Sequence, residues 1–290
     1  MVDFLSIVWN VDPVICQIGP IALRYYSLLF IAGFPLGYWI LTKCYRREGV
    51  DVQILESLLY ALLIGTVVGA RLGHCLFYQP DYYLSNGHFL EIFQPWKGGL
   101  ASHGGTIGVI LAICWHARKY GKKYNFDQMW EMDRIAVVVC WAACCIRLGN
   151  LFNSEIYGGE TNLPWGFIFE RRGEVVPKHP TQLYEALTYA ILGVILTIAY
   201  FRKLDRLHRG WFSGIFFIGC FGMRFLIEFI KEDQVDFEAG MALNMGQLLS
   251  LPFVAFGIWC LWYSATKKIP ARRTEPVKTH YCPPPKSQRR

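Results

Sequence analysis

The chain has 290 residues, of which 53% are hydrophobic, 16% aromatic and only 18% charged. Its mean hydropathy is +0.27, whereas about 25% of the residues of an ordinary soluble domain are charged. This composition excludes a disordered protein and disfavours a soluble one, because the apolar residues form long blocks of membrane-spanning length. The formal net charge of +7 could point to nucleic acid. The basic residues are instead distributed as in a membrane protein, so no nucleic-acid partner is expected.

Seven apolar blocks predict an all-α integral membrane protein with seven transmembrane helices. Helices are favoured over a β-barrel because the blocks are continuous, and because a helix satisfies its own backbone hydrogen bonds in lipid. Residues 1–20 contain no Lys or Arg, so the first block is expected to be retained as a span and not cleaved as a signal peptide. The fifth block is short, and its helix could begin a few residues earlier. The predicted spans are 21–42, 57–78, 98–117, 135–153, 186–201, 210–230 and 247–265.

The basic residues between the blocks predict the orientation of the chain, because cytoplasmic loops carry an excess of Lys and Arg. One set of alternate connections holds twenty: three in 43–56, five in 118–134, four in 202–209 and eight in 267–290. The other set holds five, in 1–20, 79–97, 154–180 and 231–245. We therefore expect a periplasmic N-terminus and a cytoplasmic C-terminus. Residues 1–265 are expected to form one catalytic domain, and the basic, proline-rich residues 266–290 a disordered cytoplasmic tail.

Neither the cysteines nor any motif predicts a metal or a cofactor. The sequence has no phosphate-binding loop and no nucleotide fingerprint. Seven of the ten cysteines lie in apolar blocks without CxxC spacing, which favours small buried hydrophobic residues over metal ligands. These are Cys75, Cys114, Cys140, Cys144, Cys145, Cys220 and Cys260.

Four arginines fall inside the predicted spans, where each costs about 2.5–3.5 kcal/mol at a helix centre and usually faces a cavity or a partner. Arg24 is close enough to its helix end to reach the interface, and Arg71 has the alternative of holding helices together. Arg224 has the alternative of an i, i+4 pair with Glu228. Arg147 has no acidic residue within four positions, so its charge is available for another partner. A functional role is favoured for Arg147.

The polar residues of the spans gather at one predicted depth, the outer end of each span. Only His116 clearly belongs to an inner end. A conduction path would have polar groups along its whole depth, so this distribution favours an enzyme acting at the outer leaflet. The residues are Arg24, Tyr26, Arg71, His74, His103, Arg147, Asn150, Asn153, Glu155, His179, Gln182, Glu185, Arg224, Glu228, Asn244, Met245, Gly246 and Gln247.

His103 is surrounded by five glycines in residues 98–108. Close helix packing explains glycines, but it does not explain the histidine. An imidazole titrates near neutral pH and can accept a proton. We therefore favour a catalytic or substrate-binding role for His103.

Four stretches resemble a known family when taken together and in this order. The sequence is similar, over about residues 12–252, to the bacterial prolipoprotein diacylglyceryl transferases. The stretches are Arg147-Leu148-Gly149-Asn150 continuing through Asn153, Glu155 and Gly158; His103-Gly104-Gly105; His179-Pro180-Thr181-Gln182-Leu183-Tyr184-Glu185; and Arg224 to Glu228 followed by Met245-Gly246-Gln247.

The resemblance implies an enzyme of the bacterial inner membrane whose active site faces the outer leaflet. Such an enzyme moves an sn-1,2-diacylglyceryl group from phosphatidylglycerol to the lipobox cysteine thiol of a prolipoprotein, and glycerol 1-phosphate leaves. It implies catalytic roles for Tyr26, His103, Arg147 and Arg224. The phosphatidylglycerol site would comprise Arg147, Asn150, Glu155, Gly158, Arg224 and Glu228.

The chemistry of these residue types fits that reaction. The leaving phosphate carries charge that lipid does not stabilise, and Arg147 and Arg224 can donate charge-assisted hydrogen bonds to it. His103 can accept the thiol proton, because a cysteine with a pKa of about 8.5 is mostly protonated at neutral pH.

The remaining positions have supporting roles. Tyr26 and Asn150 are expected to orient the headgroup, and Glu155 and Glu228 to position the arginines. Cys220 stands where the family often has tyrosine, so a polar contact is either missing there or supplied by another residue.

Other classes of membrane protein remain as alternatives. A transporter or channel predicts essential polar residues in the inner half of the spans, and the sequence offers few. A retinal protein needs a lysine within the seventh block, whereas Lys267 and Lys268 follow its end. Another lipid-modifying enzyme is the third alternative.

Overall fold

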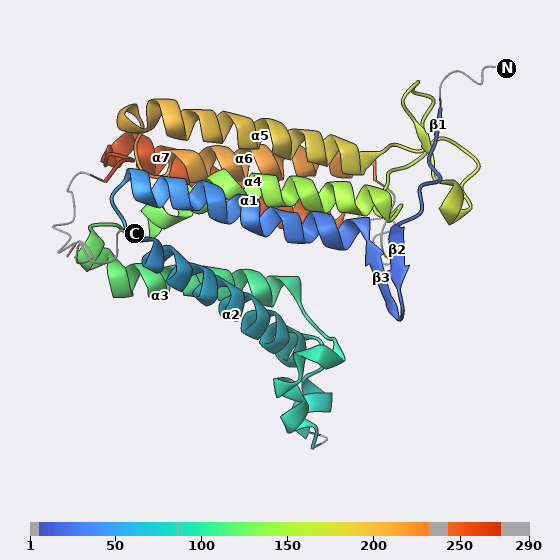
Figure 1. The fold of residues 1–290 in the computed structure, drawn as a ribbon, viewed down its shortest axis with the longest axis horizontal. Coiled ribbons are helices and arrows are strands. Elements are labelled where there is room, and N and C mark those ends of the chain that lie inside the picture. The colour runs from blue at the N-terminus through green and yellow to red at the C-terminus, as the bar shows by residue number, and fades with distance from the viewer. Residues whose placement is uncertain (1–5, 86, 232–242, 274–290) are drawn as a thin grey trace, which may run out of the picture. The chain divides into compact units, whose positions relative to one another are not determined.

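The computed structural model describes residues 6–85, 87–231 and 243–273 (Figure 1). Each of the seven predicted blocks contains a long helix. The fifth helix begins at Thr181, five residues before the predicted start. The bounds are α1 Tyr25–Arg47, α2 Val52–Phe77, α3 Ser102–Tyr124, α4 Gln128–Phe152, α5 Thr181–Lys203, α6 Trp211–Glu228 and α7 Met245–Lys267.

Six of these helices are long and apolar enough to cross a membrane, as judged within the described residues. The exception is α3, which has 23 residues but carries four glycines, two histidines and four basic residues near its end. Many large hydrophobic side chains on the six helices are exposed, as expected of helices that face lipid. The fold is therefore that of a mostly helical, multi-pass membrane protein.

The first predicted span begins too early. Residues Ile21–Arg24 form strand β3, which pairs antiparallel with β2 (Val14–Ile18), and α1 begins only at Tyr25. Gly19 takes a positive φ in the turn between the strands, and Pro20 follows it. Arg24 consequently lies in a strand and is exposed. A second pair of short strands joins β1 (Ile7–Val8) in parallel to β4 (Phe167–Ile168).

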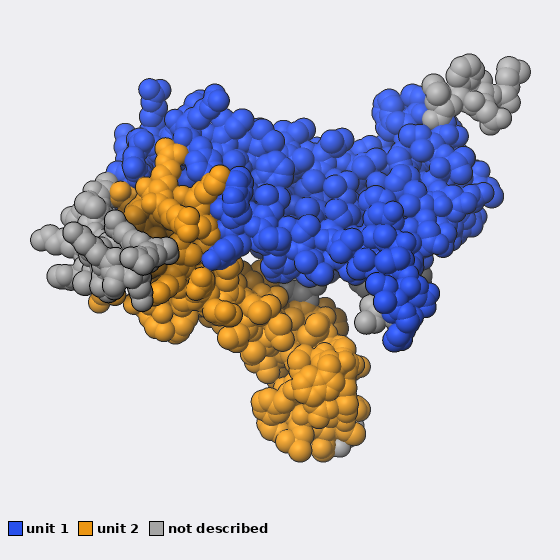
Figure 2. Space-filling view, in the orientation of Figure 1, with its two compact units in different colours: residues 1–41, 132–272 blue, residues 42–131, 273–290 orange. Residues whose placement is uncertain are grey.

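The chain divides into two compact units, coloured separately in Figure 2. The first comprises residues 1–41 and 132–272, and the second residues 42–131 and 273–290. The first unit therefore holds most of α1 and α4 together with α5, α6 and α7. The second unit holds α2 and α3.

Neighbouring helices of the first unit approach one another at small residues. An ideal Cβ on Gly33 of α1 would lie 3.3 Å from the Cα of Ala142 in α4. Gly193 of α5 packs against the Trp141 ring in α4, and Gly214 of α6 packs against Leu261 in α7. Close approach at small residues is how helices gain packing energy where burial from water does not drive association.

A buried carboxylate fixes the start of α6. Asp133 of α4 accepts hydrogen bonds from the backbone N–H of Gly210 (2.8 Å) and Ser213 (2.9 Å), and from the Ser213 hydroxyl (2.7 Å). An anion at a helix N-terminus satisfies unpaired N–H groups and the helix dipole. Near the end of α7, residues 269–271 pair with the backbone of residues 207–209. The rest of the predicted tail, residues 274–290, lies outside the described residues.

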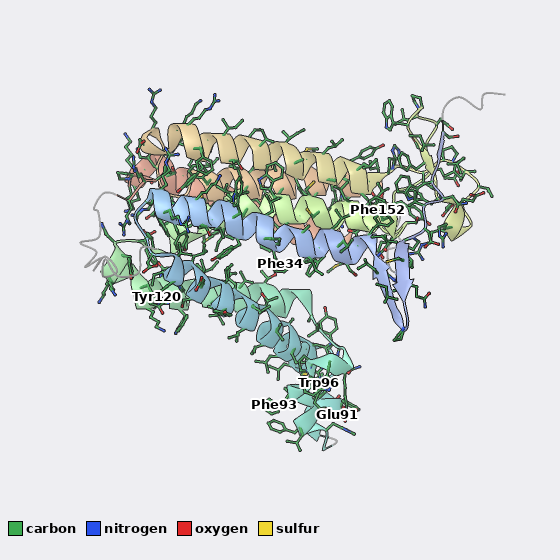
Figure 3. The ribbon with its side chains drawn as sticks, in the orientation of Figure 1. Phe34, Glu91, Phe93, Trp96, Tyr120 and Phe152 are labelled. Atoms are coloured by element: carbon green, nitrogen blue, oxygen red, sulfur yellow. The ribbon has the colours of Figure 1, made fainter. Side chains whose placement is uncertain are left out.

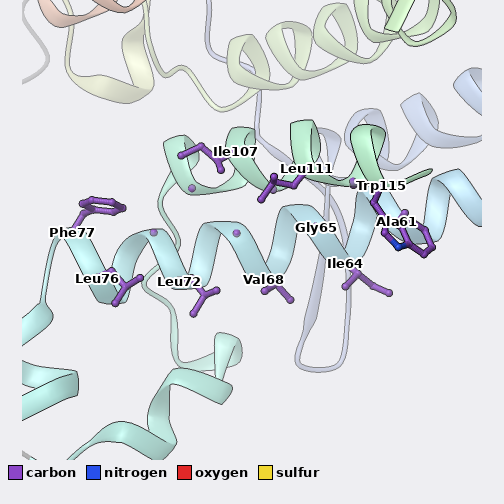
Figure 4. Close-up of a pocket in the computed structure, with 15 residues that line it drawn as sticks. Ala61, Ile64, Gly65, Val68, Leu72, Leu76, Phe77, Ile107, Leu111 and Trp115 are labelled. Atoms are coloured by element: carbon purple, nitrogen blue, oxygen red, sulfur yellow. The ribbon is translucent and has the colours of Figure 1, made fainter. Parts of the chain in front are cut away.

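In the second unit α2 and α3 lie side by side along a row of glycines. Gly65, Gly69 and Gly73 of α2 face Gly104 and Gly108 of α3. One face of this pair forms an apolar groove of about 570 Å³. Figure 4 shows its lining side chains, with Ile64, Val68, Leu72, Leu76 and Phe77 on α2 and Ile107, Leu111 and Trp115 on α3.

Arg71 of α2 organises the connection from α2 to α3. Its guanidinium donates to the carbonyl oxygens of Glu91 (2.5 Å), Ile92 (3.1 Å) and Gly98 (2.6 Å). Arg71 is therefore explained by a structural role, which was one of the two predicted alternatives. The connection holds three short helices, η1 Asp81–Ser85, η2 Phe89–Phe93 and η3 Pro95–Lys97. Figure 3 shows Phe93 and Trp96 on it, and both side chains are largely exposed.

His116, the one polar residue predicted at an inner end, is fully buried and pairs with Glu131. Its Nδ1 lies 2.5 Å from the carboxylate, and its Nε2 lies 3.0 Å from the carbonyl oxygen of Ile54. A carbonyl only accepts, so Nε2 must carry a proton. The contact with Glu131 ties α3 to the start of α4.

The close approach of α2 and α3 predicts a large difference in stability between two Gly→Ala substitutions three residues apart in α3. A Cβ on Gly108 would lie 2.6 Å from the carbonyl carbon of Gly65, whereas one on Gly105 would lie 3.5 Å from the Ala70 Cβ. We expect Gly108→Ala to lower the free energy of unfolding by roughly 1–3 kcal/mol, as overpacking does, and Gly105→Ala to leave it unchanged or raised. Denaturation in detergent measures both, and equal effects would contradict this packing.

Candidate active site

The end of α4 carries a chain of hydrogen-bonded side chains. Arg147 and Asn150 lie three residues apart on one helix face, and the Arg147 Nη1 donates to the Asn150 Oδ1 at 3.3 Å. The Asn150 Nδ2 donates in turn to the Glu155 carboxylate at 2.8 Å, and Asn153 donates to the same oxygen at 3.2 Å. Four of the motif residues are thus connected in the structure.

The turn after α4 is held by side chains from the start of α5. Ser154 and Ile156 have positive φ values of 53° and 61°, which residues other than glycine seldom adopt. Buried Gln182 donates to the carbonyl oxygen of Glu155 at 2.7 Å, and the Thr181 hydroxyl donates to that of Ile156 at 2.8 Å. These bonds keep Glu155 within reach of Asn150.

The partner of Arg147 is Glu185 in the first turns of α5. The Arg147 Nε and the Glu185 carboxylate form an ion pair in which the Glu185 side chain is only 1% exposed and that of Arg147 13%. Lys231, also 1% exposed, donates to the other Glu185 oxygen at 2.8 Å. Arg147 thus finds its acidic partner on a neighbouring helix and not within its own.

Glu228 extends this network to α7. Lys231 donates to its carboxylate at 3.0 Å, and the carboxylate lies over Gly246, where an ideal Cβ would come within 2.5 Å of the Glu228 Cδ. Gly246 is in the first turn of α7, so the negative charge meets the positive end of the helix dipole. The described ion pair of Glu228 is therefore with Lys231, and not the i, i+4 pair with Arg224 considered from the sequence.

Tyr26 and Arg224 complete the set in the first unit, and both side chains are half-buried. The Tyr26 ring packs on Gly149, where a Cβ would lie 2.7 Å from its Cδ2, so this glycine allows α1 to approach the end of α4. Arg224 lies on α6, and it and Arg147 are both within electrostatic range of buried Tyr189.

Tyr189 also accounts for Cys220, where the resembling family often has tyrosine. The Tyr189 side chain lies near the Cys220 thiol. The phenol at this place is thus supplied from α5. Sequence reasoning did not name Tyr189, because nothing in its own surroundings distinguishes it from an apolar helix residue.

Gly158 is explained by packing in the loop after α4. Its N–H donates to the carbonyl oxygen of His179 at 2.8 Å, and a Cβ would lie 2.8 Å from the Thr181 Cγ2. The next residue, Gly159, has no neighbour closer than 3.9 Å to such a Cβ.

Burial lowers the pKa of His179, which favours its neutral imidazole.

His103 belongs to the second unit. It lies in the first turn of α3, and its side chain is outside the described residues. Its role therefore remains a prediction. Within the first unit the structure brings together seven predicted site residues and four others. The predicted ones are Tyr26, Arg147, Asn150, Glu155, Gly158, Arg224 and Glu228. The other four, which were not predicted as site residues, are Glu185, Gln182, Tyr189 and Lys231.

This arrangement defines a multi-pass membrane protein with a charged site at the helix ends of its first unit. The site lies at the starts of α1, α5 and α7 and at the ends of α4 and α6, where Figure 1 also shows the short strands. Arginines fixed by carboxylates can present forked N–H donors to a phosphate or carboxylate.

Comparison with known proteins identifies the family. The sequence model of the prolipoprotein diacylglyceryl transferases matches residues 13–263. A phosphatidylglycerol-prolipoprotein diacylglyceryl transferase of Tolumonas auensis is 45% identical over 260 residues, which cover 90% of this chain and 98% of that protein. Those of Bacteroides fragilis and Porphyromonas gingivalis are 44% and 46% identical, covering 91% and 88% of this chain and 97% and 93% of theirs. The chain belongs to the prolipoprotein diacylglyceryl transferase family.

The network around Glu185 predicts that removing its charge lowers the free energy of unfolding far more than removing a surface charge does. Glu185→Gln leaves Arg147 and Lys231 with one buried carboxylate fewer, and breaking a buried ion pair costs roughly 3–5 kcal/mol. Glu160→Gln removes a carboxylate that is 71% exposed and lies 3.8 Å from Lys178, for which we expect a change below about 1 kcal/mol. Unfolding in detergent compares the two variants, and similar losses would contradict the network.

Proposed function

We propose that the chain transfers the sn-1,2-diacylglyceryl group of phosphatidylglycerol to the lipobox cysteine thiol of a prolipoprotein, the first step of lipoprotein maturation. Membership of the family and the names of the relatives support the donor and the acceptor. The structural observation that carries the proposal is the ion pair of Arg147 with buried Glu185. Arg147 and Arg224 are both within electrostatic range of buried Tyr189.

The reaction replaces a carbon–oxygen bond by a carbon–sulfur bond. The thiol loses its proton, the thiolate attacks the glyceryl carbon, and the phosphate ester leaves as glycerol 1-phosphate. Negative charge grows on the leaving oxygen in surroundings that lack water. Arg147 and Arg224 stabilise this charge, and such stabilisation is strongest where the donors are already oriented.

The other site residues hold phosphatidylglycerol and the arginines. Asn150 joins Arg147 to Glu155 and orients the headgroup together with Tyr26. Glu228 contributes through Lys231, which shares its charge with Glu185. Gly158 serves the site by allowing the loop to pack closely on the start of α5.

We further propose that all seven helices, α3 included, cross the bacterial inner membrane. The basic residues of alternate connections support a periplasmic N-terminus and a cytoplasmic C-terminus. With this orientation the starts of α1, α5 and α7 and the ends of α4 and α6 face the periplasm. The active site then opens toward the outer leaflet, where an exported lipobox cysteine arrives.

Reconstitution tests the transferase activity directly. The purified chain, phosphatidylglycerol and a lipobox peptide should release glycerol phosphate and increase the peptide mass by one diacylglyceryl group. Arg147→Ala should lower the rate by roughly 10²–10³, the usual loss when one oriented donor to developing charge is removed. Release that continues with a Cys→Ser peptide would indicate a hydrolase instead, and no turnover by a folded sample would favour a transport function.

The proposed role of His103 makes a prediction about pH. A base must be unprotonated, so the wild-type rate should fall as the pH drops through the imidazole pKa. His103→Gln should reduce the rate by about 10²–10⁴ and abolish this acidic limb. A variant that keeps the acidic limb at a near-normal rate would show that another group accepts the proton.

A further inference from the structure

A second polar pocket lies on the first unit, beside the turn that holds Glu155. Its volume is about 280 Å³, close to the lower end of the range for small-molecule sites, about 300–1,000 Å³. Arg24 reaches it from β3, Arg171 and Arg172 from the short helix η4 (Glu170–Arg172), and Asn153 and Glu155 from the turn after α4.

The charges of this pocket favour an anion. Three guanidinium groups and one carboxylate line it, which gives a formal charge of +2. The carboxylate of Glu155 already accepts hydrogen bonds from Asn150 and Asn153. No cation among the described residues forms an ion pair with it.

The three arginines are held to different degrees. The Arg172 Nε donates to the carbonyl oxygen of Ser154 at 2.9 Å, which fixes its direction. Arg171 lies 3.4 Å from Asp12, and both side chains are exposed. Arg24 is exposed and forms no hydrogen bond or ion pair with another described side chain. Arg24 and Arg171 can therefore turn toward a ligand at little cost.

The pocket is connected to the proposed phosphatidylglycerol site. Glu155 lines the pocket and also accepts the hydrogen bond of Asn150, which itself accepts one from Arg147. Two hydrogen bonds thus separate the pocket wall from the guanidinium that we assign to the leaving phosphate. A phosphate ester that departs from Arg147 on this side meets three further arginines.

We propose that this pocket is a second phosphate-ester site of the protein. The inference rests on the proposed function, since that reaction releases glycerol 1-phosphate, a monoester with a charge of about −1.5 to −2 at neutral pH. The pocket remains cationic even when the ion pair of Arg171 with Asp12 is counted, which suits a monoester with nearly two negative charges. Arginine forks also fit the several oxygens of a terminal phosphate.

Direct binding of labelled glycerol 1-phosphate tests the site without turnover. The full chain in phospholipid-free micelles should bind it, and the double variant R24Q/R171Q should bind at least about tenfold more weakly, the loss expected for one charged hydrogen bond. The matched control R202Q/K203Q removes two exposed charges from the end of α5 and should bind like wild type. R24Q alone serves as a second variant, because no described side chain depends on Arg24.

A second binding experiment, with phosphatidylglycerol, distinguishes a free phosphate ester from a lipid headgroup. If R24Q/R171Q weakens only the retention of phosphatidylglycerol in nanodiscs, the pocket binds a lipid headgroup. If neither free glycerol 1-phosphate nor phosphatidylglycerol distinguishes R24Q/R171Q from the control, the proposed pocket is wrong. Transfer activity measured on the same preparations separates the two claims. Binding without transfer contradicts the proposed function alone, and transfer without binding contradicts the pocket alone.

Discussion

A buried carboxylate between two cations is the interaction on which the rest of the site depends. Glu185 is held between Arg147 and Lys231, and all three side chains are largely withdrawn from solvent. Charges in a low dielectric are stable only when they are paired and hydrogen-bonded. Arg147 comes from α4, Glu185 from α5 and Lys231 from beyond the end of α6. Their pairing therefore holds these three segments in contact with one another.

The same network leaves Arg147 equipped for a ligand. A guanidinium has five N–H donors, of which the Arg147 Nε faces Glu185 and one on Nη1 faces Asn150. The other three have no partner among the described residues. Lys231 carries the network on to Glu228, whose carboxylate meets the first turn of α7 at Gly246. The buried charges of the network therefore neutralise one another. Arg147 is held in a fixed orientation, yet three of its N–H donors have no partner among the described residues.

The sequence predicted the seven helices because each apolar block is continuous, and it located Arg147 because no neighbouring acid explained its charge. It did not predict that Glu185 is the partner, since the two residues are brought together by helix packing and not by spacing along one helix. Lys231 was treated as a loop cation because burial is not visible in a charge count. The strand at Ile21–Arg24 was missed because a short apolar strand before an apolar helix looks like part of the helix.

The central claim is that Glu185 acts on phosphatidylglycerol through Arg147. A double-mutant cycle tests it most directly, with the dissociation constant of phosphatidylglycerol measured in mixed micelles for wild type, Glu185→Gln, Arg147→Gln and the double variant. We predict that Glu185→Gln weakens binding by about tenfold, which is roughly 1.4 kcal/mol, in the presence of Arg147 and has little effect in its absence. An equal loss in both backgrounds would show that Glu185 acts independently of Arg147 and would contradict the account.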